Sequence, residues 1–227
     1  MDDQRVRLGP VRAVIFDLDG VLIDSEGLWD EVRRDLAARH GLPWPQAATR
    51  AMMGMSTREW STYLADEVGV PGTPEQLAEE VIDAMAERYR ASLPLIPGAQ
   101  EAVARLAPRW RLGLASSSPR RLIDTVLDAA DITSLFEFTV STEEVEGGKP
   151  SPAVYLEVVR RLGVPAPETA AIEDSTNGLR AAHAAGLAVV ALPHAAFPPS
   201  TEALGLADAR IDNLAEVTPE LIESLRR

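Results

Sequence analysis

The strongest constraint on the fold is a series of short apolar runs that recur along the chain with helical patterns between them. The runs lie at Val11–Asp17, Arg111–Ser116, Ala170–Glu173 and Leu187–Leu192. Alternating strand and helix patterns are typical of parallel βα units. Because each run is almost continuously apolar, helices should cover both faces of the sheet. The sequence therefore predicts an α/β fold built on a parallel sheet.

The sequence between the first two expected strands differs, because it shows helical patterns only. Breaks in those patterns fall at Gly41–Pro43, Gly54–Ser56 and Val70–Pro74. We therefore expect an insertion of about four helices over residues 26–91, and a core domain formed by residues 1–25 and 92–227. The insertion leaves the sheet just after Asp19, so it should lie over that strand end and act as a lid. A helical decoration without a catalytic part is the alternative.

Composition narrows the possible partners. A chain of 227 residues with 46% hydrophobic residues can bury a full core. The formal charge of −13 argues against a nucleic-acid backbone or an anionic membrane surface as a partner. No apolar stretch approaches the roughly 20 residues of a membrane span, and no signal segment follows Met1. We expect a cytoplasmic monomer that acts on a small molecule.

The chain has no cysteine, which excludes disulfides, thiolate nucleophiles and cysteine-bound metals. The three histidines, His40, His183 and His194, lack the spacing of metal ligands. Any metal ion should therefore be held by oxygen atoms.

The first apolar run ends in two carboxylates, Asp17 and Asp19, followed by Gly20. Residues two apart on a strand share a side, and the glycine lets the backbone turn. Two like charges about 4 Å apart repel by roughly 4 kcal/mol at an effective dielectric constant near 20, so the pair favours a bound cation. We predict a Mg²⁺ site here. A solvated turn is the alternative for this short pattern taken alone.

The second strand runs into three hydroxyl residues, Ser116, Ser117 and Ser118, before Pro119. Ser118 is most simply interpreted as the N-cap of the next helix. Ser116, at the strand tip, is then free to face a ligand. A hydroxyl group together with the N–H groups of a helix start can hold an anion.

Lys149 lies between two glycines and the sequence Pro150–Pro152. An exposed loop lysine is the default interpretation, but the prolines restrict this loop and favour a side chain aimed at one point. An ammonium group there can bind a phosphate oxygen or keep a nucleophilic carboxylate ionised.

The third run ends in Glu173 and Asp174 and opens a helix. Asp174 or Ser175 can serve as the helix cap. The two acids also complete a set of oxygen ligands with Asp17, which suits Mg²⁺. We interpret Gly178, with the alanines that follow it at helical spacing, as a packing face.

The four stretches, in this order, resemble the four motifs of the haloacid dehalogenase-like superfamily, and the helical insertion resembles its C1 cap. Asp17–Glu26 and Glu173–Gly178 are similar to the β-phosphoglucomutase-like and sugar-phosphate phosphatase branch. The similarity runs from about Val11 to Asn213. It implies a Rossmann-like core with the cap inserted after the first strand.

The resemblance also implies a role for each motif residue. Asp17 would be the nucleophile that forms an aspartyl-phosphate, and Asp19 the acid and base. Mg²⁺ would be held by Asp17, the carbonyl of Asp19 and Asp174, with Glu173 acting directly or through water. The phosphoryl group would be bound by Ser116, Ser117, Lys149 and Gly20.

Departures from the family pattern restrict the reaction. The dehalogenases lack an aspartate at the position of Asp19, and phosphonatases need a cap lysine that residues 26–92 do not contain. Trp29 stands where β-phosphoglucomutase has a histidine, and its surroundings look closer to hexitol and 2-deoxyglucose phosphate phosphatases. Trp29 is equally a candidate core anchor of the lid. Arg58 is either a substrate contact or a surface residue.

We therefore predict a Mg²⁺-dependent phosphomonoesterase that acts on a small sugar or sugar-alcohol phosphate. A mutase of the β-phosphoglucomutase kind is the first alternative. A metabolite-binding protein without activity is the second, and it would predict loss of the nucleophile or the acid.

Overall fold

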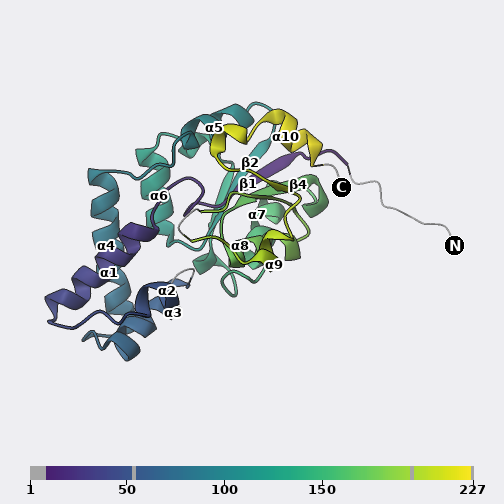
Figure 1. Cartoon of the computed structure of the whole chain (residues 1–227). Helices are drawn as coiled ribbons and strands as arrows, with labels where there is room; N and C mark the ends of the chain where they lie inside the picture. The colour runs from purple at the N-terminus through teal and green to yellow at the C-terminus, as the bar shows by residue number, and fades with distance from the viewer. Residues whose placement is uncertain (1–8, 53–54, 195–196, 226–227) are drawn as a thin grey trace.

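The computed structural model describes residues 9–52, 55–194 and 197–225, which contain a six-stranded sheet (Figure 1). The strands are β1 (Ala13–Phe16), β2 (Arg111–Ser116), β3 (Phe138–Ser141), β4 (Thr169–Glu173), β5 (Ala188–Ala191) and β6 (Ala209–Arg210). They lie in the order β3-β2-β1-β4-β5-β6, and all pairs are parallel. The four predicted strands are confirmed with slightly different ends. The predicted α/β fold is therefore correct.

Of the two edge strands, β3 was not predicted, whereas β6 only partly matches a strand pattern that the sequence shows around Ile211. The edge strand β3 begins with an exposed phenylalanine and a half-buried threonine, so it carries no apolar run. The other edge strand, β6, has two residues and lies next to a strand pattern around Ile211. Edge strands have one neighbour and less burial, and both therefore give a weak sequence signal.

Helices cover both faces of the sheet. Ala13 and Ile15 of β1 face α7 (Ala153–Leu162) and α8 (Thr176–Ala184). The intervening residues, Val14 and Phe16, join a second apolar cluster with other helices. These are α5 (Ala99–Leu106), α6 (Arg120–Ala129) and α10 (Pro219–Ser224). A short helix, α9 (Thr201–Leu204), precedes β6. The alternation along β1 follows from the twofold side-chain period of a strand.

The expected all-helical region is confirmed, and it lies to one side of the sheet (Figure 1). Its elements are α1 (Glu26–Arg39), α2 (Ala48–Met52), α3 (Thr57–Tyr63), a π-helical turn η1 (Leu64–Val68) and α4 (Pro74–Ala91). The expected break at Gly54 lies outside the described residues. Thr73 caps α4 by accepting a hydrogen bond from the Gln76 N–H, and Pro74 fits the first helical position.

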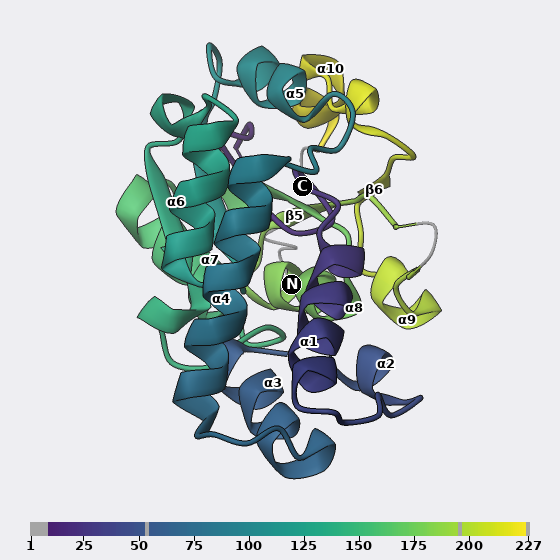
Figure 2. The ribbon, with the colours of Figure 1, turned by 90° about the vertical axis from the view of Figure 1, so that its left-hand side faces the viewer.

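The longest helix, α4, packs against both α1 and α6 and so joins the helical region to the sheet layer (Figure 2). No helix in the described part of the chain is both long and apolar enough to cross a membrane.

The sheet brings three strand ends together. β1 is central, between β2 and β4, and Phe16 is level with Leu114 and Ile172. The residues that follow these three positions therefore emerge at one edge of the sheet. In open α/β sheets, ligands bind at the carboxyl ends of strands where the strand order reverses, which is at β1 here.

We predict that Gly113→Ala destabilises the protein. A β-carbon at Gly113 would lie 2.4 Å from Val158 Cγ1 of α7, so the helix would have to move away from β2. Overpacking of this kind costs about 1–3 kcal/mol. The free energy of unfolding from urea titration measures the effect. Gly27→Ala is the control, because a β-carbon there would meet no atom within 4 Å. Equal stability of the two variants would contradict the packing argument.

Candidate active site

Lys149, the only lysine in the sequence, lies at the centre of a buried ion cluster. Its Nζ is 2.8 Å from Asp17 Oδ1 and 2.6 Å from Glu173 Oε1, and it donates to the carbonyl of Ala115 at 3.1 Å. Asp17 follows β1, Glu173 ends β4 and Ala115 lies in β2. Through this ion pair with Asp17 and hydrogen bonds to Glu173 and Ala115, the ammonium group connects three adjacent strands.

Glu173 is fully buried, and the chain's own donors satisfy both of its oxygens. Oε1 accepts from Lys149 and from the Tyr155 hydroxyl at 2.6 Å, and Oε2 accepts from the Ser175 hydroxyl at 3.3 Å. Ser175 is the N-cap of α8, as one of the two sequence interpretations had it. Sequence reasoning missed Tyr155, which lies 18 residues from its partner.

Gly178 is more than a packing residue, and that interpretation needs correction. A β-carbon at this position would lie 1.9 Å from Glu173 Oε2. The glycine therefore leaves the space that the buried carboxylate occupies. Gly20 likewise leaves space for the carboxylate of Asp174, because a β-carbon added at Gly20 would lie 2.0 Å from Asp174 Oδ2. Gly20 also has a φ of +80°, which side chains disfavour.

The carboxylates of Asp17, Glu173 and Asp174 each offer an oxygen within 4.8 Å of the others. Asp174 Oδ1 is buried and has no hydrogen-bond partner. A buried, unpaired carboxylate oxygen is costly unless a cation or donor meets it. These residues therefore fit a divalent cation with oxygen ligands. The side chain of Asp19 is not in this group, and the resemblance implied only its carbonyl oxygen as a ligand.

Burial and mutual repulsion shift the titration of the cluster. Burial, with the nearby charge of Glu173, raises the pKa of Asp17 to about 8, although Lys149 opposes the shift. Burial, followed by Glu173 and Asp17, raises the pKa of Asp174 well above its usual range. Burial alone would lower the pKa of Lys149, but Asp17 and Glu173 raise it overall. Burial and mutual repulsion therefore favour the protonated forms of Asp17 and Asp174, because one lysine cannot neutralise three ionised carboxylates.

Asp19 lies in a separate hydrogen-bond network. Its Oδ1 accepts from the Ser25 hydroxyl at 2.5 Å and more weakly from the Trp29 indole at 3.4 Å. Its Oδ2 accepts from the Ser118 hydroxyl at 2.6 Å and from Ser116 at 3.4 Å. The carboxylate is thereby fixed from both the core and the helical region.

Two interpretations of the serine run were wrong. Pro119, not Ser118, is the N-cap residue of α6, and the Ser118 hydroxyl binds Asp19 instead. Ser116 is fully buried, and its Oγ accepts from the Ser118 N–H at 2.9 Å, so it is not a free hydroxyl. Ser117, half-buried, lines a small cavity beside Asp19.

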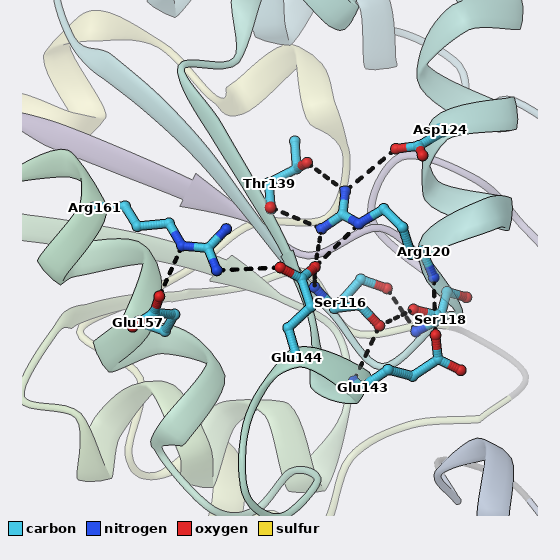
Figure 3. Close-up of polar contacts among 10 residues, drawn as sticks. Ser116, Ser118, Arg120, Asp124, Thr139, Glu143, Glu144, Glu157 and Arg161 are labelled. Carbon is cyan, nitrogen blue, oxygen red and sulfur yellow. Dashed lines mark hydrogen bonds and ion pairs between the residues drawn. The ribbon is translucent and has the colours of Figure 1, made fainter.

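Arg120 and Arg161 fix the loop that leads to Lys149 (Figure 3). Arg120 donates to Thr139 Oγ1 at 2.6 Å and pairs with Glu144, which also pairs with Arg161 at 3.1 Å. The backbone N–H of Arg120 donates to the Glu143 carboxylate at 3.2 Å. Exposed ion pairs contribute little stability each. The network's main effect is to hold the turn after β3 against α6 and α7.

Two of the cavities between the helical region and the core are lined by predicted site residues. One of about 60 Å³ is lined by Asp19 and Trp29, together with residues of α1, α2, α3 and the serine run. The other, of about 880 Å³, is lined by Arg58 and Lys149 with parts of α4 and the loop before Lys149. Trp29 is 7% exposed and packs on Trp60 at 5.9 Å between ring centroids, so it anchors the helical region while its indole reaches Asp19. Arg58 is exposed.

Residues 11–186 match the family model of haloacid dehalogenase-like hydrolases. The chain belongs to this family. A phosphorylated carbohydrates phosphatase of Thermotoga maritima is 34% identical over 178 residues, which cover 78% of this chain and 82% of the relative. Hexitol phosphatase B of Escherichia coli strain K12 is 34% identical over 214 residues, which cover 92% of this chain and 95% of the relative.

Among solved structures, CbbY from Rhodobacter sphaeroides, in complex with phosphate, superimposes with a TM-score of 0.79. It is 26% identical, and the match covers 94% of this hydrolase and 99% of the CbbY chain. The family recognised from the motifs is thus confirmed, and so is the expectation of an enzyme of the phosphatase kind.

We predict that a divalent cation stabilises this hydrolase more at pH 8 than at pH 5.5. Asp17 binds its proton more tightly in the folded chain, with a pKa of about 8, than in the unfolded chain, where it is near 3.8. Without metal, the stability that this proton contributes is lost as the pH rises between those values. Bound metal opposes the loss, because it needs the ionised carboxylates.

Thermal unfolding with a chelator and with added Mg²⁺ across this pH range measures the effect. The variant Asp174→Asn removes one ligand and should show a much smaller cation-dependent shift. A shift of the midpoint that is the same at both pH values, or the same in Asp174→Asn, would contradict the assignment.

Proposed function

We propose that this hydrolase is a Mg²⁺-dependent phosphomonoesterase that acts on a small sugar or sugar-alcohol phosphate. The observation that carries the proposal is the placement of Asp17 between Lys149 and Asp174, with the hydrogen-bonded Asp19 two residues further along. The relatives named above, for phosphorylated carbohydrates and hexitols, support the substrate class.

In the first step, Asp17 is the nucleophile. A carboxylate oxygen attacks phosphorus, the bond from phosphorus to the ester oxygen breaks, and Asp19 gives its proton to the leaving alcohol. The product is an aspartyl-phosphate and the free alcohol. In the second step, water attacks the phosphorus, Asp19 takes a proton from it, and Asp17 is released with inorganic phosphate.

Each remaining residue of the site positions or neutralises charge. Lys149 favours the ionised form of Asp17 and holds the carboxylate in place through the 2.8 Å contact, and its ammonium group can bind phosphoryl oxygens as they gain charge. Ser117 and the backbone at Gly20 complete the phosphate site, while Ser116 and Ser118 hold Asp19.

Mg²⁺ would be held by Asp17, Asp174 and the carbonyl of Asp19. Glu173, whose oxygens are engaged by Lys149 and Tyr155, would act on the ion from further away. When bound, the ion supplies positive charge that offsets the repulsion between the carboxylates and the phosphoryl group.

We further propose that residues 26–91 form a cap domain over the core of residues 1–25 and 92–227. Trp29 reaches Asp19 from this cap, and Arg58 faces the larger cavity that contains Lys149. Closure of a cap excludes bulk water from a reactive phosphoryl intermediate. Trp29 favours hydrolysis over a mutase reaction, because its indole cannot titrate like the imidazole that β-phosphoglucomutase has at this position.

We predict that Asp17→Asn lowers turnover by about a thousandfold or more, because an amide cannot form the aspartyl-phosphate. The fold should remain, since the two side chains have the same shape, and circular dichroism would show this. The matched control is Asp35→Asn, an exposed residue of α1 paired with Arg88. It should keep the parent rate. Full activity in Asp17→Asn would exclude this mechanism.

We also predict Mg²⁺-dependent phosphate release from at least one sugar or sugar-alcohol phosphate. A chelator should abolish the reaction, and added Mg²⁺ should restore it. Sugar isomers are followed in the same samples by chromatography. Isomer conversion without phosphate release would favour the mutase, and neither reaction with any phosphorylated compound would favour a binding protein.

A further inference from the structure

The smaller cavity has a composition that the reaction at Asp17 does not require. Besides Asp19, it is lined by Glu26, Arg33 and the indoles of Trp29 and Trp60. The remaining lining residues are Met52, Met55, Ser117, Ser118 and Pro119. A cavity of about 60 Å³ beside the acid that protonates the leaving group is the natural place for that group.

Arg33 is the unusual member of this set. It is 7% exposed, and its Nε is buried without a hydrogen-bond partner. The guanidinium carbon lies 4.8 Å from the ring centroid of Trp29 and 4.9 Å from that of Trp60. Burial lowers the pKa of Arg33 to about 10, with Glu26 opposing, so the group remains charged at neutral pH. Two indoles thus hold a buried cation whose Nε–H needs an acceptor.

Glu26 supplies the complementary group. It lies two turns before Arg33 on α1, and burial, followed by the charge of Asp19, raises its pKa to about 7. At neutral pH this carboxyl group can accept a hydrogen bond or donate one. The cavity therefore offers a fixed donor and an amphoteric partner between apolar walls.

This combination matches hydroxyl groups better than a second anion. A hydroxyl oxygen accepts from Arg33, and its hydrogen is donated to Glu26, while the carbon chain contacts the indoles and thioethers. A carboxylate or second phosphate would meet Arg33 but would also lie beside Glu26, whose ionised form carries the same charge. Like charges at that range offset much of the attraction to the guanidinium group.

Resting on the proposed function, we propose that Arg33 and Glu26 are specificity residues that select a neutral polyhydroxylated leaving group over one with a second anionic group. Arg33 contacts the hydroxyl oxygens, and Trp29 and Trp60 fix its plane. Neither residue takes part in the chemistry at phosphorus.

The test compares matched substrates that differ only in one terminal group. Glycerol 3-phosphate and sorbitol 6-phosphate are paired with 3-phosphoglycerate and 6-phosphogluconate, and acetyl phosphate serves as a reference without hydroxyl groups. The parent enzyme should prefer the polyol of at least one pair by about tenfold in kcat/KM. Arg33→Met keeps the aliphatic packing and should lower kcat/KM for that polyol by about tenfold or more, mainly through KM, while acetyl phosphate changes little.

Three further variants sharpen the result. Glu26→Gln should narrow the preference for the polyol over the acid, and Arg33→Lys should recover only part of the lost affinity, because it lacks the planar fork. Arg34→Met is the control: the same change on the next residue, which is exposed and paired with Asp30. It should leave all substrates unaffected.

The outcomes separate this inference from the proposed function. Unchanged polyol kinetics in Arg33→Met, an equal loss with acetyl phosphate, or a parent preference for the acids would each overturn the specificity assignment. If the parent enzyme with Mg²⁺ hydrolyses neither acetyl phosphate nor any other compound of the set, the proposed function fails, and the inference fails with it.

Discussion

The buried contact between Lys149 and the carboxylates of Asp17 and Glu173 is the interaction on which the site depends. Removing one partner of a buried ion pair typically costs about 3–5 kcal/mol, because the remaining charge is left in a poor solvent. Glu173 is satisfied by donors of the chain itself, whereas Asp174 is not. The cluster is therefore complete on the side of the lysine and open on the side of Asp174, and this asymmetry defines where a cation fits.

Asp19 links the core to the helical region. Ser118 fixes it from the loop after β2, and Ser25 and Trp29 fix it from the start of the helical region. Trp29 in turn packs on Trp60 and supports Arg33. A change in the position of α1 would therefore reach Asp19, the proposed general acid, through two hydrogen bonds. The substrate selection proposed for the small cavity and the proton transfer proposed for Asp19 would therefore depend on the same helix.

Sequence reasoning found the parts of the site that follow from short-range patterns. Asp17, Asp19, Glu173 and Asp174 lie at or just after the ends of apolar strands, and parallel strands bring such ends to one edge. It failed where contacts join residues that are distant in the sequence. Ser118 donates to Asp19, 99 positions away, whereas the local sequence favoured a helix-capping role for Ser118. Arg33 resembles any charged residue of an amphipathic helix, because its burial between two indoles depends on how α1 meets α3.

The chain's only side-chain amine is the one at the centre of this site. Its side chain is 4% exposed and bound to two carboxylates, so in the folded protein it is shielded from reagents that acylate amines. Arginine supplies every other permanent side-chain cation, and such reagents do not attack guanidinium groups. The rate at which Lys149 is acylated therefore reports how often the buried ion cluster becomes accessible to solvent, and no engineered label is needed.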